Sequence, residues 1–274
     1  MTLSTSTGHR TASEKDLMNT ENLSFQLRDV GVQLQSGKSA AQILHGINLD
    51  IYQGEFLGIV GRSGTGKTTL LRALAGLVPA TGDLTYEGAP LSGPPPTVVM
   101  VFQDYGQALL PWRTVERNVA LGLEGRVDKS QRADRVNEAL SMVGLESRAS
   151  EYPWRLSGGM QQRVQIARSL AMRPKVLLMD EPFGALDALT KASLQDQLLR
   201  VQEETKSTVV FITHDIDEAA YLSDRVVVIE DTPGTIGTPF STDLPRPRDQ
   251  ITTREDPRYL EVRHQLGEAL RHDR

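Results

Sequence analysis

The sequence predicts an α/β fold in which a mostly parallel sheet is covered by helices on both faces. Short apolar runs at 56–60, 176–179 and 226–229 have the length of buried strands. Helical patterns separate these runs along the chain. The 274 residues are 39% hydrophobic and 24% charged, which is ordinary for a globular protein that builds a core.

The first third of the chain is expected to be mostly extended. Residues 1–22 are rich in Ser and Thr with almost no large apolar side chains, so we expect a disordered tail. Extended segments follow at about 23–34 and 47–60, split by a polar loop at 36–39. Between about 80 and 100, Gly and Pro breakers leave room for short strands only.

A helix is expected over 130–143, because apolar residues recur there on one face of a helical pattern. Ser130 is a suitable N-cap, and Gly144 is well placed to end the helix. The apolar face consists of Ala133, Val136, Leu140 and Val143.

Strands and helices alternate through the rest of the chain. We expect a helix from Ser157, a strand at 176–180, a helix at about 188–205, and strands at 208–213 and 225–230. After a Pro-rich segment, Asp256 and Pro257 mark the start of a last helix. The apolar stripe of that helix is Tyr259, Val262, Leu266 and Leu270.

Composition excludes several classes of function. The net charge of −5 argues against a basic surface for nucleic acid. The absence of cysteine excludes disulfides, thiolate metal sites and thiol catalysis. No run approaches the ~18 apolar residues of a membrane-spanning helix, and the N-terminus lacks the apolar stretch of a signal peptide. Any role at a membrane is therefore expected to depend on docking to a partner.

A phosphate-binding loop is the first chemical motif. The residues Gly61, Arg62, Ser63, Gly64, Thr65, Gly66, Lys67, Thr68 and Thr69 follow the P-loop pattern. Glycines allow backbone N–H groups to surround phosphate oxygens, and the following helix directs its positive end at them. Lys67 can reach the β and γ phosphates, and the Thr68 hydroxyl can bind Mg²⁺. The motif predicts nucleoside triphosphate binding, but it is shared by kinases, GTPases, helicases and transporters.

A second motif separates these classes. The stretch Leu156-Ser157-Gly158-Gly159-Met160-Gln161 resembles the signature motif of the ABC ATPase family. Ser157 can cap a helix whose exposed amides bind an anion, and the glycines admit a phosphate close to the backbone. The resemblance implies a head-to-tail dimer. In it, Ser157, Gly158, Gly159 and Gln161 of one subunit close over ATP held by the P-loop of the other.

Four further segments resemble this family. Residues 176–181 are similar to a Walker B strand, which implies that Asp180 supports Mg²⁺ and that Glu181 orients and polarises the attacking water. Residues 185–187 resemble the D-loop at the dimer interface. His214 matches the switch histidine that contacts the γ-phosphate. Gln103 resembles the Q-loop glutamine, which contacts Mg²⁺ and its water and links the site to a permease.

Together these segments give the expected site. The catalytic residues implied are Glu181, His214, Gln103 and Lys67. The metal-binding residues implied are Thr68, Gln103 and Asp180. The cofactors are ATP and Mg²⁺.

The resemblance also implies a domain organisation. We expect an ABC ATPase domain over 23–235 with a P-loop NTPase core and an antiparallel β subdomain. An α-helical signature subdomain is expected at about 104–172, and a C-terminal extension with a short helix at 236–274.

Residues 109–115 and 244–248 resemble the nitrate/sulfonate/taurine branch of bacterial importers. This resemblance implies an energy-coupling subunit for uptake of a small anionic solute. Its partners would be a second copy of itself, integral membrane permease subunits and, indirectly, a periplasmic solute-binding protein, but no nucleic acid. Its place would be the cytoplasmic face of the inner membrane.

One position departs from the family pattern. The family usually has an adenine-stacking aromatic about two dozen residues before the P-loop, and the matching stretch, 30–35, contains none. We expect Leu34 to act there as an apolar cover.

Two other functions are alternatives to transport. A soluble ABC-type ATPase for DNA repair, chromosome dynamics or translation usually carries coiled-coil insertions, zinc modules or tandem cassettes, whereas this chain has one cassette and no cysteine. A small-molecule kinase with a P-loop leaves residues 157–161 unexplained.

A partner-binding surface is expected beside Gln103. The apolar cluster Leu109, Leu110, Pro111 and Trp112 lies in a loop, where such clusters favour binding over core packing. We expect the loop from Gln103 to Val115 to receive a short cytoplasmic helix of the permease. The alternative is that Trp112 packs inward.

Overall fold

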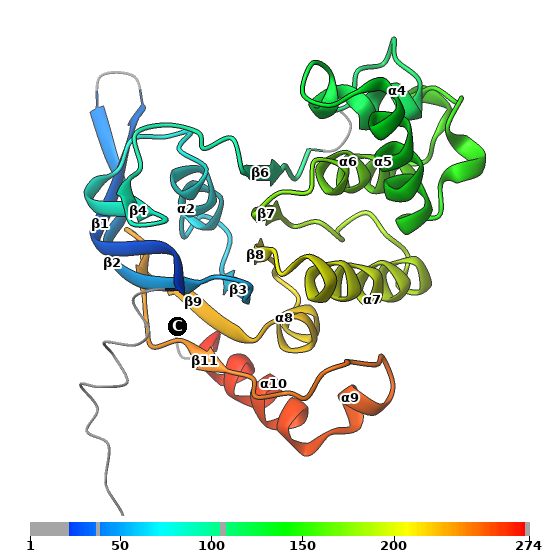
Figure 1. Cartoon of the computed structure of the whole chain (residues 1–274). Coiled ribbons are helices and arrows are strands. Elements are labelled where there is room, and N and C mark those ends of the chain that lie inside the picture. The colour runs from blue at the N-terminus through cyan, green and yellow to red at the C-terminus, as the bar shows by residue number, and fades with distance from the viewer. Residues whose placement is uncertain (1–21, 37–38, 105–107, 272–274) are drawn as a thin grey trace, which may run out of the picture.

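The computed structural model describes residues 22–36, 39–104 and 108–271. The tail expected at 1–22 lies almost wholly outside these residues, as does the centre of the loop expected at 36–39. Within the described part of the chain, the strands form two sheets that lie beside each other (Figure 1).

The larger sheet has seven strands, and its centre is parallel. The order is β10–β9–β3–β8–β7–β6, with β11 paired to β9. The strands are β3 (Phe56–Gly61), β6 (Val98–Val101), β7 (Val176–Asp180), β8 (Thr208–Ile212), β9 (Arg225–Glu230), β10 (Thr235–Ile236) and β11 (Phe240–Ser241). Because β3, β6, β7 and β8 run in the same direction, the loops after them meet at one edge of the sheet. The α/β fold expected from the sequence is confirmed.

The smaller sheet is antiparallel and has the order β2–β1–β4–β5. Its strands are β1 (Leu23–Ser36), β2 (Ser39–Tyr52), β4 (Thr81–Tyr86) and β5 (Ala89–Pro90). The single extended segment expected over 47–60 is wrong. The chain turns between β2 and β3, where Gly54 has a φ of 73° and the Glu55 carboxylate accepts a hydrogen bond from Tyr52 N at 2.8 Å. These two residues lie in the turn that separates the two strands.

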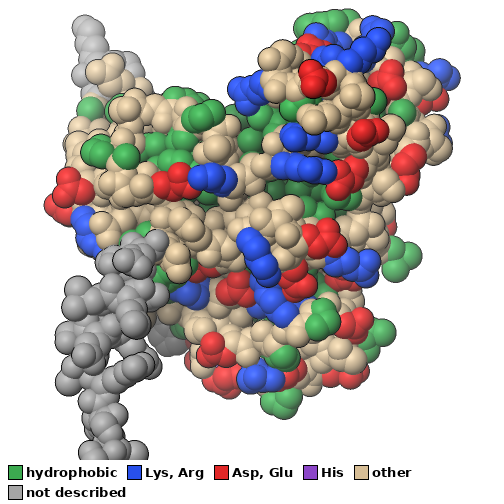
Figure 2. Space-filling model, in the orientation of Figure 1, with side chains coloured by type: hydrophobic (Ala, Val, Ile, Leu, Met, Phe, Trp, Pro, Cys, Tyr) green, Lys and Arg blue, Asp and Glu red, His purple; other side chains and the backbone are tan. Residues whose placement is uncertain are grey.

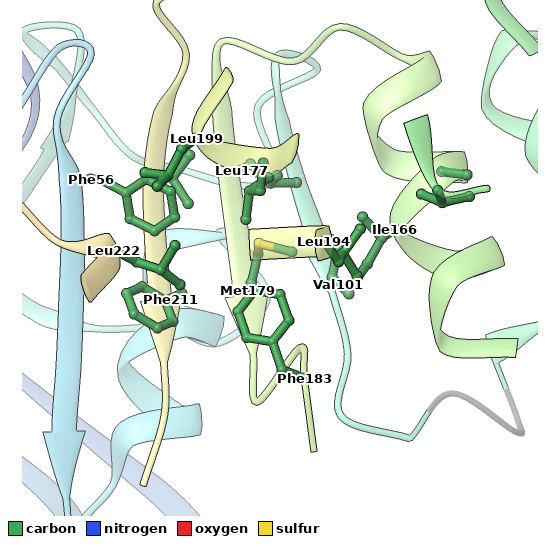
Figure 3. Close-up of a cluster of buried hydrophobic side chains, with 14 of the residues drawn as sticks. Phe56, Val101, Ile166, Leu177, Met179, Phe183, Leu194, Leu199, Phe211 and Leu222 are labelled. Carbon is green, nitrogen blue, oxygen red and sulfur yellow. The ribbon is translucent and has the colours of Figure 1, made fainter. Parts of the chain in front are cut away.

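The larger sheet is buried on both faces because successive side chains of each strand point to opposite sides. Phe56 packs in one cluster with Leu177 and Phe211 (Figure 3), whereas the next residue, Leu57, packs in a second cluster with Leu70 of α2 (Lys67–Leu74). The second cluster also holds the apolar residues of β1 and β2. Two separate cores therefore fix the sheet edge that carries the loops.

Helices cover the face of the larger sheet that carries Phe56, and further helices lie beyond one end of this sheet (Figure 1). They are α4 (Val115–Ala120), α5 (Lys129–Met142), α6 (Gly158–Ala171), α7 (Ala188–Thr205), α8 (Ile216–Leu222), α9 (Thr252–Glu255) and α10 (Pro257–Ala269). Short 3₁₀ turns lie at η2 (Leu121–Leu123), η3 (Glu146–Arg148) and η4 (Pro153–Arg155). Helices α4, α5 and α6 form a group of their own.

The start of α5 differs from the expectation. Ser130 lies inside the helix, and Asp128 occupies the N-cap position. Ala133 is exposed, and Ala139 is buried with Val136 and Leu140. The reason is that the first turn of α5 lies on the surface, so the buried stripe begins one turn later. Gly144, with a φ of 64°, follows the C-cap as expected.

The C-terminal helix is fixed to α8. Asp256 caps α10 by accepting from Arg258 N, as expected, and Tyr259 is buried. The Tyr259 hydroxyl donates to Asp217 Oδ1 at 2.9 Å. Arg248 is also buried and donates to the Tyr221 carbonyl at 2.9 Å. The extension therefore holds the helix that follows His214.

The surface is mixed in charge. Figure 2 shows acidic and basic side chains interspersed over the face in view. None of the helices in the described ranges has both the length and the apolar character needed to cross a bilayer.

Candidate active site

The P-loop geometry favours glycine at two positions. All of β3 is buried, and the loop after it leads into α2. Gly66 has a φ of 97°, and a Cβ there would lie 2.7 Å from the Leu44 side chain. A Cβ on Gly61 would lie 2.5 Å from the Ile229 carbonyl oxygen. Side chains at either position would displace the loop.

The start of α2 has the features of an anion site. No side chain caps this helix, whereas Ser157, Asp187 and Asp215 cap α6, α7 and α8. Its first backbone N–H groups are therefore directed at the loop. Lys67 is buried, and its Nζ donates to the carbonyls of Gly61 at 2.8 Å and Arg62 at 2.6 Å. Burial lowers the pKa of Lys67, while the nearby carboxylates of Glu181 and Asp180 oppose this shift.

Thr68 and Asp180 meet beside this loop. Asp180 ends β7 and is 3% exposed, and its carboxylate is hydrogen-bonded to the Thr68 side chain. Burial raises the pKa of Asp180, and the Thr68 hydrogen bond opposes that shift. One carboxylate with one hydroxyl is an oxygen set that Mg²⁺ accepts when phosphates complete its shell. These residues therefore fit the Mg²⁺ ion that is expected from the sequence.

Glu181 contacts two more of the expected site residues. Its Oε2 accepts a hydrogen bond from Gln103 Nε2 at 3.0 Å and lies 3.4 Å from His214 Nδ1. Gln103 follows β6, Glu181 follows β7, and His214 follows β8. The structure therefore brings together Gln103, Glu181 and His214 at the edge where the P-loop also lies.

The signature residues bond within their own loop rather than to this edge. Ser157 Oγ accepts from Met160 N at 3.4 Å, which caps α6 as expected. Gln161 Nε2 donates to the carbonyls of Pro153 and Leu156. Figure 1 shows α6 set apart from α2, in the group with α4 and α5. One chain therefore carries two helix starts suited to phosphate, at separate places.

The D-loop stretch connects these places. Asp187 Oδ1 accepts from Thr190 N at 3.0 Å and caps α7. A Cβ on Gly159 would lie 3.0 Å from the Ala185 carbonyl oxygen, so the signature helix packs closely on this stretch.

The apolar cluster expected to bind a partner is smaller than the sequence predicts. Leu109 is buried in the core, so its inclusion in a binding surface is wrong. Trp112 is 72% exposed, so the alternative in which it packs inward is wrong as well. Residues 105–107 of the expected loop lie outside the described residues.

Leu34 is partly buried and packs against the cluster beneath the smaller sheet. Its role as an adenine cover stays a prediction.

Sequence reasoning missed two residues at this site. A Cβ on Gly234 would lie 2.2 Å from the Thr65 carbonyl oxygen, so the turn after β9 packs closely against the P-loop. Gln162 donates to the Glu181 carbonyl at 3.3 Å. The signal for Gln162 was its amide group on the buried face of an expected helix, where a polar side chain needs partners.

Comparison with known proteins adds independent findings. A family model described as ABC transporter matches residues 44–184. The chain is 46% identical over 236 residues to the nitrate import ATP-binding protein of Synechococcus elongatus, which covers 84% of this chain and 36% of that protein. The chain thus spans about a third of that relative's length.

Two further matches cover most of the compared protein. A bicarbonate transport ATP-binding protein of Synechococcus elongatus is 43% identical over 235 residues, covering 84% of each chain. Among solved structures, a dimeric ATP-binding cassette in a post-hydrolysis state with ADP and Pi has a TM-score of 0.72 and 32% identity. It covers 79% of this chain and 98% of that one.

Proposed function

The chain belongs to the ABC transporter family of ATP-binding proteins, and from this membership we propose that it hydrolyses ATP to drive import of a small anion. The observation that supports the proposal is the meeting of Gln103, Glu181 and His214 from three strand ends beside the P-loop. Phosphoryl transfer to water requires an acceptor for the water proton, polar groups oriented on that acceptor and a phosphate cradle.

Nucleotide binding is assigned to the P-loop. The backbone N–H groups from Gly64 to Thr69 surround the β and γ phosphates, and Lys67 turns from the loop carbonyls to the phosphate oxygens. Thr68, Asp180 and Gln103 would hold Mg²⁺, which when bound neutralises charge on the β and γ phosphate oxygens.

Hydrolysis is assigned to Glu181. Its carboxylate accepts a proton from water as the water oxygen attacks the γ-phosphorus and the bond from that phosphorus to the bridging oxygen breaks. The products are ADP and inorganic phosphate. Gln103 and His214, which already contact the same carboxylate, orient the water and the γ-phosphate.

The signature residues are assigned to a second copy of the chain. Ser157, Gly158, Gly159 and Gln161 start a helix away from the chain's own P-loop, so they suit the phosphates of a nucleotide bound by a partner. A dimeric cassette is among the similar solved structures.

Transport is assigned through the relatives. Proteins named for nitrate import and bicarbonate transport point to a small anion as the solute. We place the dimer on the cytoplasmic face of the membrane beneath permease subunits, with a periplasmic binding protein that delivers the anion. The domain limits inferred above, 23–235 for the ATPase and 236–274 for the extension, belong to this proposal.

Lys67→Ala tests the phosphate site. We expect ATPase activity to fall by at least about 10²-fold, because one fixed cation facing the β and γ phosphates is lost. The fold should persist by circular dichroism, since within the described part of the chain the Lys67 amine donates to carbonyls of its own loop. Lys206→Ala, at the far end of α7, is the matched control and should hydrolyse ATP normally. Wild-type activity in Lys67→Ala would overturn the assignment.

A further inference from the structure

The backbone of Glu181 has a conformation that its own residue type disfavours. Its φ is 47°, in the left-handed region where a Cβ is costly. Residues held in such a region persist only when their surroundings fix them. The carboxylate of Glu181 contacts Gln103 and His214 from this conformation. Glu181 begins the turn that runs to Ala185. The contacts that fix this turn therefore also set where the Glu181 carboxylate points.

The side chain of Gln162 holds this turn at two points. Its Nε2 donates to the Glu181 carbonyl at 3.3 Å, and its Oε1 accepts from Ala185 N at 3.2 Å. Gln162 is 3% exposed, so no competing water surrounds its amide. Among the described residues, the Glu181 backbone has one other hydrogen bond to a residue outside the turn. Its N–H donates to the Ile212 carbonyl of β8 at 3.1 Å. One amide group thus spans the turn that carries Glu181.

Gln162 belongs to a row of polar side chains on α6. Gln165 Nε2 donates to the Phe102 carbonyl at 3.0 Å, and Arg168 Nη1 donates to the Ala108 carbonyl at 2.7 Å. These residues are spaced by three along the helix and so share one face. The signature helix is therefore bonded to the backbone of both segments that carry Gln103 and Glu181.

We propose that Gln162 is a positioning residue for ATP hydrolysis, because it fixes the turn from Glu181 to Ala185 so that the Glu181 carboxylate faces Gln103 and His214. It acts through Glu181 and does not touch the nucleotide. The proposal rests on the assignment of Glu181 as the base in the proposed function.

Gln162→Met tests this proposal. Methionine keeps the length of the side chain and removes both its donor and its acceptor. We expect kcat for ATP hydrolysis to fall about 10–10²-fold, because small displacements of catalytic groups have effects of this size. The KM for ATP and equilibrium ATP binding should stay at the wild-type values, since the P-loop is untouched. Gln195→Met, which removes another buried amide on α7, is the control and should retain wild-type kcat.

A double-mutant cycle separates positioning from general loosening of the structure. In a Glu181→Gln background, single-turnover hydrolysis should show no further loss from Gln162→Met, because the residue acts only through Glu181. An additional loss as large as in the wild type would overturn the proposal, as would wild-type kcat in the Gln162→Met single variant. If Gln162→Met fails to fold by circular dichroism, Gln162→Glu carries the same test, since it keeps the acceptor for Ala185 N and loses the donor. Normal hydrolysis by Glu181→Gln alone would instead refute the proposed function.

Discussion

Buried side chains at the site are held by neighbours from distant parts of the sequence. Asp180 is hydrogen-bonded to Thr68, and Glu181 is contacted by Gln103 and His214. Lys67 is buried between two loop carbonyls, with both carboxylates close enough to oppose the effect of burial on its pKa. Catalytic geometry here is therefore a property of contacts between segments.

Thr68→Val tests the proposed metal-binding role of the Thr68 hydroxyl. The substitution keeps the shape of the side chain but removes the hydroxyl that bonds Asp180 and would bind Mg²⁺. We expect the Mg²⁺ concentration for half-maximal ATPase activity to rise by about tenfold or more, as for loss of a hydrogen bond to a charged group. The measurement is a Mg²⁺ titration at fixed ATP. Thr205→Val at the end of α7 should leave the titration unchanged, and an unshifted titration for Thr68→Val would contradict the role.

Sequence patterns located most of these residues but not their mutual contacts. The P-loop and the acidic end of β7 could be found because glycine spacing and an apolar strand are local signals. The packing of Gly234 against Thr65 and the hydrogen bond from Gln162 to the Glu181 carbonyl could not be predicted. Each depends on contact between segments that are far apart in the chain. No local pattern encodes such a contact.

Secondary-structure elements position the site by their direction. Strands β3, β6, β7 and β8 run parallel, so four loops that are distant in sequence meet at one edge. The sequence predicted the strands at 176–180 and 208–213 and the helix at 188–205 closely, since each is bounded by clear polar or glycine signals.

Other elements were predicted less well, for physical reasons. The turn between β2 and β3 is too short to interrupt an extended pattern, so the sequence predicts one extended segment over 47–60 where the structure has two strands. Helices α4 and α8 span only 6 and 7 residues, too few for a periodic apolar pattern to emerge. Surface exposure of the first turn of α5 removed Ala133 from its buried stripe.

The loop before α4 offers a prediction about the partner. Trp112 is 72% exposed, so Trp112→Ala removes no core packing. We expect solute uptake by the assembled transporter to fall about tenfold or more, as for loss of an aromatic anchor at an interface, while ATP binding by the isolated subunit stays normal. Leu260→Ala, another exposed apolar residue, on α10, is the control for uptake. Normal uptake with Trp112→Ala would count against docking at this loop.

At the scale of the whole molecule, the chain carries two helix starts that are suited to phosphate, and we propose that they serve different nucleotides. The start of α2 contains Lys67 and lies beside Asp180, whereas the start of α6 lies in the separate helical group. In a single chain, therefore, the signature residues do not lie over the P-loop of the same chain. Two copies arranged head to tail would complete both sites.

ATP-dependent dimerisation of Glu181→Gln tests this central claim most directly. Glutamine keeps the size of the side chain but removes the proton acceptor, so hydrolysis should slow by a factor of about 10²–10⁴ while ATP still binds. ATP that bridges two copies then favours the dimer by mass action. By size-exclusion chromatography with light scattering, the variant should be a dimer in ATP and a monomer without it. Adding Ser157→Arg should abolish that dimer, because the arginine blocks the site for the partner's phosphate. A Glu181→Gln variant that stays monomeric in ATP, or a double variant that still dimerises, would contradict the account.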